Sequence, residues 1–286
     1  MKKLILILAL LIFCLSVRSQ HLYMRQDLSN QTIESLIKDN GISEFRIFTE
    51  SKFLTNDNLD LKKLEKSIVE AIPNPKDSGF LVLNWEGDGL KELFSQKNNV
   101  KFANYIQQYV EALRFVKKLR PQIKCAYYNI PFPRYEFTDR YYAQRIDKLN
   151  KIIREQDFLA PSMYIRYPKS ITKNREYIRA NMEFALRAAK QYNKPIYPFV
   201  WHRVNPIDKN NAWQLVPLNI FKETIKEVLN ANYGNKKVNG IFWWHSENNV
   251  FSKRATTGEF KSISNREEYL KTLFMRYYQT IGSLTK

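Results

Sequence analysis

The sequence predicts an α/β fold, a TIM-like barrel of alternating strands and helices. Short apolar runs rich in branched and aromatic residues alternate with amphipathic stretches along most of the 286 residues. None of these runs is followed by a Gly-x-Gly-x-x-Gly turn, which argues against a doubly wound dinucleotide-binding sheet. Polar and aromatic residues follow most of the runs, at the strand ends where a barrel carries its chemistry. A barrel is therefore favoured over an open sheet.

Each element in the first half of the chain has a local signal. The predicted strands are apolar or alternating runs, at residues 22–24, 45–48 and 79–83. The predicted helices have apolar residues at helical spacing. They run from a cap near Ser29 to Gly41, from 59 to 72 with Pro73 after it, and from 102 to 116 with Pro121 ending the pattern.

The same alternation continues to the C-terminus. The predicted strands are 123–128, 158–165, 196–201 and 238–244, and the predicted helices are 139–155, 174–192, 221–229 and 267–281. The chain thus contains seven strand-like runs. Helical connections between them indicate parallel pairing.

The N-terminus predicts a secretory signal peptide at residues 1–20, which leaves residues 21–286 as a single barrel domain. Met1-Lys2-Lys3 supplies a positive start, residues 4–15 an apolar core, and small residues stand near the end. A membrane anchor is the alternative, but the apolar stretch is short for a bilayer. We therefore expect a secreted or periplasmic protein. Its one remaining cysteine, Cys125, leaves no intrachain disulfide.

The chain is strongly basic, with a formal charge of +18, or 18 − 3 = +15 without Lys2, Lys3 and Arg18. A basic surface outside the cell favours polyanionic partners such as acidic polysaccharide, nucleic acid or anionic lipid. Because the lysines are scattered, a solvated surface without a specific ligand is the alternative. Only this positive charge supports a nucleic-acid-binding function.

Glu86 is the first catalytic candidate, because it stands at the end of the apolar run 79–83. Asn84, two residues earlier, points to the same side of the strand. Other strand ends carry aromatic and polar side chains, which suit a sugar ligand because ring faces bind C–H groups and polar groups fix hydroxyls. Core packing is the alternative for any one aromatic, but their recurrence favours a carbohydrate site. These residues are Tyr127, Tyr128, Tyr164, Trp201, His202, Arg203, Trp243 and Trp244.

Metal, cofactor and nucleophile chemistry have little support in the sequence. The histidines His21, His202 and His245 lack a metal-binding spacing. Cys125 lies inside an apolar strand and is expected to be core packing. No Gly-x-Ser-x-Gly turn occurs. We expect neither a metal nor a cofactor.

From about residue 47 onward the chain resembles the hyaluronidases, glycoside hydrolase family 56. The matching segments follow the family's order. They are residues 61–73 as the helix before the catalytic strand, 80–86 as that strand, 119–131, 160–164, 195–200 and 240–244. The resemblance implies the distorted seven-stranded barrel of that family.

The resemblance also implies a secreted enzyme that cleaves β-linked N-acetylhexosamine in glycans of the hyaluronan or chondroitin type. In this retaining mechanism the substrate's own acetamide oxygen is the nucleophile. Glu86 would be the general acid and then the base. Tyr164 would contact the acetamide, Trp244 would wall its pocket and Tyr127 would line the cleft. The predicted substrate-binding residues are Tyr127, Tyr164, Trp244, Trp85, His202 and Arg203.

Two positions depart from the family. Asn84 stands where the family has an aspartate, which holds the acetamide N–H and stabilises the positive charge of the cyclised intermediate. An amide oxygen accepts the N–H but supplies no charge, and losing one such group costs about 2.7–4 kcal/mol. Val204 stands where several relatives have a tyrosine, for which His202 or Arg203 is the nearest substitute.

The neutral Asn84 leaves a second hypothesis open, a glycan-binding relative with impaired catalysis. Two other carboxylates are candidates to restore the charge. One is Asp88, expected in the turn between Gly87 and Gly89, and the other is Glu247.

Overall fold

The computed structural model describes residues 21–25, 30–95, 99–131, 139–245, 247, 250–251, 260 and 263–285. The predicted signal peptide at residues 1–20 and the predicted helix cap at Ser29 lie outside them. Within the described ranges, no helix is long and apolar enough to cross a membrane.

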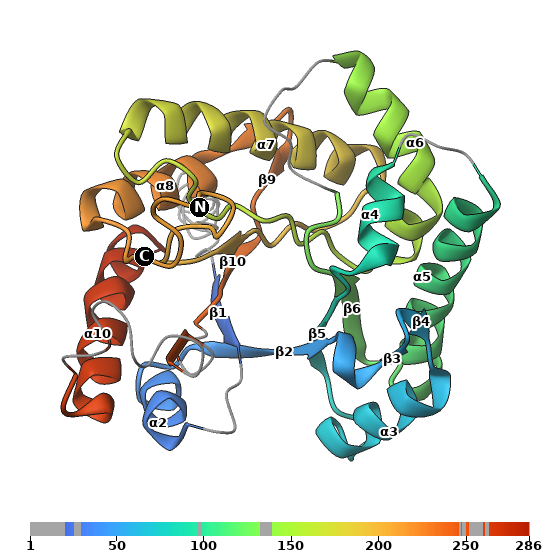
Figure 1. Ribbon diagram of the computed structural model, residues 1–286, viewed down its shortest axis with the longest axis horizontal. Coiled ribbons are helices and arrows are strands. Elements are labelled where there is room, and N and C mark those ends of the chain that lie inside the picture. The colour runs from blue at the N-terminus through green and yellow to red at the C-terminus, as the bar shows by residue number, and fades with distance from the viewer. Residues whose placement is uncertain are drawn as a thin grey trace, which may run out of the picture.

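Six parallel strands form the central sheet, in the order β6-β5-β2-β1-β10-β7. Parallel neighbours need crossover connections, and the predicted helices supply them. The bounds are β1 His21–Arg25, β2 Ser43–Thr49, β5 Gly79–Asn84, β6 Ile123–Tyr127, β7 Phe199–Val200 and β10 Gly240–Trp243. The TIM-like class that the sequence predicts is confirmed by this curled parallel sheet (Figure 1).

Residues 158–163, predicted as part of a strand, join the two edges of the sheet through isolated bridges rather than a continuous ladder. Pro161, Pro195 and Pro198 explain the interruption, because proline has no N–H to donate. The carbonyls of these prolines still accept hydrogen bonds from neighbouring segments. The parallel bridges pair Tyr128 with Ala160, Leu159 with Ile196 and Ser162 with Phe199.

Helices cover the outside of the sheet (Figure 1). Helix α2 contacts α10, α10 contacts α8 and α8 contacts α7, while α3 contacts α5 and α5 contacts α6. Side chains at four N-caps accept the N–H three residues on, as helix starts require; they are Asn30, Asp60, Asn99 and Ser170. The bounds are α2 Gln31–Asp39, α3 Leu61–Ala71, α4 Asp88–Phe94, α5 Val100–Leu119, α6 Asp139–Glu155, α7 Ile171–Gln191, α8 Leu218–Asn230 and α10 Arg266–Thr285.

Aromatic side chains fill the interior of the barrel. Phe242 of β10 stacks on Phe45 and on Tyr197, with ring centroids 4.4 and 5.3 Å apart. Tyr23 and Phe80 meet the same ring edge to face, each at 5.5 Å. These rings occupy the interior below the strand ends, so the room for a ligand lies at the C-terminal ends of the strands.

Several small elements were not anticipated from the sequence. Strands of two residues have no period that a pattern could reveal. They form the hairpins β3 Leu54–Thr55 with β4 Asn58–Leu59 and β8 Asn232–Tyr233 with β9 Lys236–Lys237, and a short helix, η1 Glu50–Lys52, precedes β3. Asp88, expected in a turn, is instead the first residue of α4.

Candidate active site

The C-terminal ends of the strands open onto one cavity of about 590 Å³. Successive residues of a strand point to opposite faces, so alternate residues at each end face this cavity. From the sheet they are Ile47 and Thr49 of β2, Asn84 and Glu86 at the end of β5, Tyr128 after β6 and Trp244 after β10. Four residues predicted for the site, Asn84, Glu86, Tyr164 and Trp244, are thereby brought together.

Glu86 and Asn84 are hydrogen bonded to each other at the end of β5. Nδ2 of Asn84 donates to Oε2 of Glu86 at 2.9 Å, because only the N–H side of an amide can donate to a carboxylate. This orientation leaves Oδ1 of Asn84 buried and without a hydrogen-bond partner among the described residues. Glu86 is exposed. The pair therefore combines an exposed carboxylate with a neutral amide whose oxygen is buried.

Two tyrosines stand near Glu86. Tyr164 is 8% exposed, and its ring centroid lies 5.8 Å from that of Tyr128. Burial and then the negative charge of Glu86 raise the pKa of Tyr128 well above its usual value. Burial and the neighbouring Tyr128 do the same for the pKa of Tyr164. Both hydroxyls therefore stay protonated at neutral pH; that of Tyr128 donates to Oγ of Ser162 at 3.0 Å.

Tryptophans extend the wall of the cavity. Trp201 packs against Tyr164 at 5.3 Å between ring centroids, and Trp213 meets Trp201 edge to face at 5.5 Å. The indole N–H of Trp201 is buried and has no hydrogen-bond partner within the described ranges. The guanidinium of Arg25 lies 5.0 Å from the ring centroid of Trp244, a cation–π contact.

Two carboxylates that the sequence pattern does not predict for the site, Glu50 and Asp57, hold the chain around Glu86. Oε1 of Glu50 accepts the backbone N–H groups of Glu86 at 2.7 Å and of Gly87 at 2.5 Å. Asp57 accepts the indole N–H of Trp85 at 3.0 Å and the backbone N–H of Gly89 at 2.9 Å. The strand-end rule that selects Glu86 also applies to Glu50, which follows β2 directly.

The glycines on either side of Asp88 allow this close packing. A Cβ at Gly87 would lie 2.4 Å from Oδ1 of Asp57, and one at Gly89 would lie 2.7 Å from Nε1 of Trp85. Because real Cβ contacts are not this short, a side chain at either position would displace Asp57 or Trp85.

Trp85 and Tyr127 lie outside the cavity, which corrects their predicted place. Trp85 is 2% exposed and stacks on Tyr109 of α5 with centroids 4.3 Å apart. Tyr127 is 1% exposed, and its hydroxyl donates to the backbone carbonyl of Tyr109 at 3.1 Å. Each is one residue away from a cavity-facing neighbour, Glu86 or Tyr128, so the alternation of the strand turns it towards the helices.

His202 and Arg203 are also not at the cavity, because both are fully buried around Glu247. Arg203 donates to the Glu247 carboxylate from Nε at 2.7 Å and from Nη2 at 2.6 Å. Trp243 donates its indole N–H to Nδ1 of His202 at 3.1 Å, so the proton of the neutral ring is on Nε2, which lies 2.9 Å from Glu247. Burial alone would raise the pKa of Glu247, but the hydrogen bonds from His202 and Arg203 outweigh it and hold that pKa far below its usual value.

Glu247 and Asp88, the two candidates to replace the missing negative charge, form ion pairs elsewhere. Glu247 belongs to the buried cluster with Arg203. Asp88 is exposed and pairs with Lys91 at 2.8 Å. Neither lines the cavity. Glu50 is the carboxylate that contacts the main chain of Glu86.

Neither a family model nor a curated protein sequence matches this chain. Among solved structures, bee venom hyaluronidase matches with a TM-score of 0.67 and 14% identity, over 93% of this chain and 99% of that chain. Bee venom hyaluronidase in complex with a hyaluronic acid tetramer matches with a TM-score of 0.65 and 14% identity, over 91% and 96%. The chain has a hyaluronidase-like fold.

That likeness concerns the fold, since the identity is low. A glycoside hydrolase family 26 β-mannanase from Bacteroides ovatus also matches, with a TM-score of 0.39 and 12% identity over 80% of this chain and 81% of that chain. A TM-score in this range carries no argument about the site. The roles of the cavity residues therefore rest on their own geometry.

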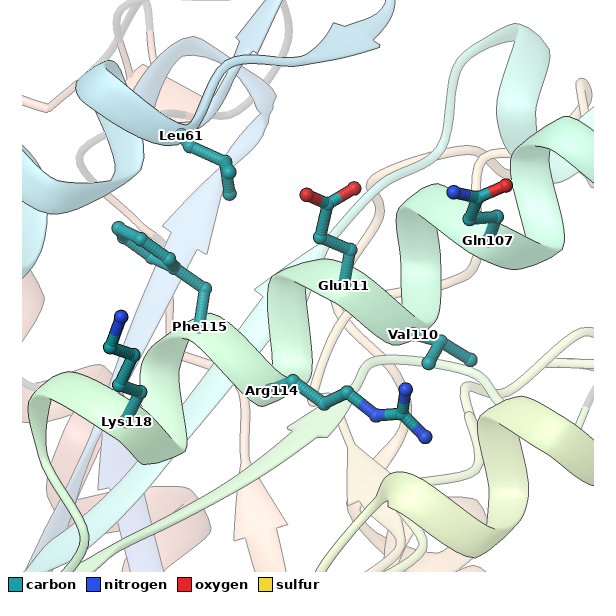
Figure 2. A pocket seen from close by; sticks show the side chains of 7 residues that line it. All are labelled: Leu61, Gln107, Val110, Glu111, Arg114, Phe115 and Lys118. Carbon is teal, nitrogen blue, oxygen red and sulfur yellow. The ribbon is translucent and has the colours of Figure 1, made fainter.

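A second hollow, of about 370 Å³, lies on the outer face of α5 (Figure 2). Its lining comes from α3 and α5 alone, and Arg114 within it pairs with Glu155 at 2.6 Å. Unlike the cavity at Glu86, it receives no side chain from a strand end. Over the described part of the chain, no group of three or more His, Cys, Asp or Glu residues could hold a metal ion. The candidate active site is therefore the cavity at Glu86.

Proposed function

We propose that the chain is a divergent member of the hyaluronidase family, glycoside hydrolase family 56. Its proposed substrates are glycans that contain β-linked N-acetylhexosamine, with hyaluronan and chondroitin as the expected class. One observation carries the proposal. Glu86 is exposed at the open end of a hyaluronidase-like barrel, and Asn84 beside it holds an unpartnered acceptor, as far as the described residues go.

In the proposed reaction Glu86 donates its proton to the glycosidic oxygen as the bond from that oxygen to the anomeric carbon breaks. The acetamide oxygen of the substrate attacks the same carbon and forms a cyclic intermediate. Glu86, now a carboxylate, then takes a proton from a water molecule that opens the ring. The configuration at the anomeric carbon is retained, and Glu86 ends the cycle protonated.

The neighbours of Glu86 fit the acetamide group chemically. An acetamide presents one N–H donor and one carbonyl acceptor. Oδ1 of Asn84 is an acceptor for the N–H, and the protonated hydroxyl of Tyr164 is a donor for the oxygen. The aromatic face of Trp244 suits the C–H groups of the ring.

Secretion forms part of the same proposal. It is supported by the positive start, apolar core and small residues of positions 1–20. A polysaccharide substrate outside the cell requires an exported enzyme.

The test incubates purified protein with hyaluronan, chondroitin and chitin fragments and measures new reducing ends. We expect release by the wild type and a drop of about 10²–10⁴-fold in Glu86→Gln, since the acid and base are both removed. Glu65→Gln, an exposed glutamate on α3, is the matched control and should behave like the wild type. Equal release by wild type and Glu86→Gln would refute the proposal.

The neutral Asn84 supports a second candidate, a glycan-binding relative with impaired catalysis. Saturable binding of a glycan by the wild type without any release of reducing ends would select it. The same assay therefore separates the two candidates when binding is measured in parallel.

A further inference from the structure

We infer that Trp213 forms a second sugar-binding position, away from Glu86, that takes the C–H face of a further pyranose unit of a longer glycan. The inference rests on the proposed function and extends it from one sugar unit to a chain. It is carried by a row of aromatic rings and by the way the main chain holds Trp213.

The aromatic row runs along the wall of the cavity. Tyr128 contacts Tyr164, Tyr164 contacts Trp201, and Trp201 contacts Trp213, with ring centroids 5.8, 5.3 and 5.5 Å apart. The row begins at Tyr128 and Tyr164, whose pKa values are raised by burial and in part by the negative charge of Glu86. Its last member, Trp213, is separated from Tyr128 by the rings of Tyr164 and Trp201, and we place it beyond the sugar unit whose glycosidic oxygen Glu86 would protonate.

The main chain at Trp213 has a conformation that a bulky residue rarely adopts. Its φ is +69°, in the left-handed region that favours glycine. A tryptophan at such a position persists only where surrounding contacts impose it, and such positions cluster at functional sites.

Those contacts come from the buried Arg203 cluster. Nη1 of Arg203 donates to the carbonyl of Trp213 at 2.7 Å, and the N–H of Trp213 donates to the carbonyl of Val204 at 3.1 Å. Arg203 is in turn held by Glu247 on two atoms. Arg203 is thus a positioning residue, which fixes the indole against Trp201 without touching a ligand.

The surroundings of Trp213 suit a sugar ring. The indole is partly exposed, unlike Trp201, which is 3% exposed. Asn205 and Ile207 line the same cavity, and Ile207 is 64% exposed. The face of an aromatic ring is electron-rich and attracts C–H groups, while an amide can bond a hydroxyl. Since Trp213 carries no charge, the position should accept neutral and acidic sugars alike.

The experiment measures binding to Glu86→Gln protein, so that turnover does not consume the ligand. Disaccharides and hexasaccharides of hyaluronan and of chitin are titrated calorimetrically into this protein and into the same protein with Trp213→Ala or Trp213→Phe. Val100→Ala, which changes an apolar side chain that is 87% exposed, is the matched control. Thermal unfolding of each protein shows whether it is folded.

We expect Trp213→Ala to weaken hexasaccharide binding about tenfold and to leave disaccharide binding unchanged, because one aromatic contact is lost only for the longer ligand. Trp213→Phe keeps a flat ring and should retain most of the affinity. Two results would overturn this inference while glycan binding stands. In one, Trp213→Ala leaves the affinity for the hexasaccharide unchanged; in the other, it lowers the affinities for the hexasaccharide and the disaccharide equally. Binding of neither glycan would overturn the inference together with the proposed function.

Discussion

Asn84 donates one amide N–H to Glu86 and keeps a buried acceptor with no partner among the described residues. It supplies no negative charge for the positive charge that would form on the cyclised acetamide. We therefore expect Asn84→Asp to hydrolyse hyaluronan about 10²-fold faster than the wild type. This factor is close to the rate change usually caused by one preorganised group that stabilises the transition state. Time courses of reducing-end release measure the rate.

Asn84→Ala is the companion variant, because it removes the acceptor without adding a charge. It should be slower than the wild type. In Asn84→Asp the new carboxylate stands next to Glu86, and two ionised carboxylates at this spacing repel. Thermal unfolding must therefore accompany the rates. A folded Asn84→Asp protein no faster than the wild type would contradict the expectation.

At the residue scale, the alternation of a strand predicts on which side a polar residue at its end lies. Glu86 and Asn84 follow an apolar run, and the alternation of the strand placed both on the cavity. Tyr127 and Tyr128 are adjacent tyrosines, so the pattern could not tell which one faces inward. Only the observed pairing of Leu83 with Tyr127 decides it, because Leu83 faces away from the cavity.

The connection from β5 to α4 depends on the turn between β3 and β4. Asp57 in that turn accepts hydrogen bonds from Trp85, from Gly89 and, at 3.1 Å, from the hydroxyl of Tyr105. Asp57 also has a φ of +57°, which asparagine tolerates. We expect Asp57→Asn to lower the free energy of unfolding by about 2 kcal/mol, because an amide cannot accept at both ends. Urea denaturation measures this loss.

A second readout comes from Tyr105, whose pKa burial and then the charge of Asp57 raise to about 12. This pKa should fall in Asp57→Asn, as ultraviolet titration of the tyrosine would show. Asp39→Asn, at an exposed position that ends α2, is the control and should change stability by less than about 0.5 kcal/mol. A similarly small change in Asp57→Asn would show that the turn does not hold the loop.

Element prediction worked for long periodic segments and failed for short ones. Helix α6 was predicted at the bounds observed, Asp139–Glu155, and α7 was displaced by only a few residues. The turn that carries Asp57 belongs to strands of two residues, whose pairing is tertiary and leaves no local pattern. Proline explains the weak ladder at residues 158–163, because Pro161 cannot donate a ladder hydrogen bond although the apolar run around it predicts a strand.

Over the whole molecule, the alternation of strands and helices sufficed to predict the barrel, because each helix must return the chain to a parallel neighbour. The buried cluster of Arg203 and Glu247 could not be predicted in the same way. Its members are 44 residues apart in the chain, and a charged residue at a strand end has the same signature whether it binds a ligand or another buried charge.

The formal charge of +18 belongs to the whole molecule, and it predicts how salt should act on binding. Salt screens attraction between a basic protein and a polyanion but leaves contacts with a neutral ligand almost unchanged. We expect hyaluronan hexasaccharide to bind Glu86→Gln protein roughly tenfold more weakly at about 0.5 M than at about 0.05 M salt, as counterion release requires. Chitin hexasaccharide, which is neutral, should change little. Calorimetric titration at both salt concentrations measures the two affinities.

The origin of this salt response can be located with a variant. Among the described residues that line the cavity, Glu86 is the only acidic or basic one, so we expect the attraction to come from cations around the rim, such as Arg25 beside Trp244. Trp213→Ala should therefore weaken hyaluronan binding at both salt concentrations by the same factor. Arg25→Gln should reduce the salt response and leave chitin binding unchanged. Hyaluronan binding that salt does not affect would show that the charge serves solubility, and a neutral glycan would then be the better substrate candidate.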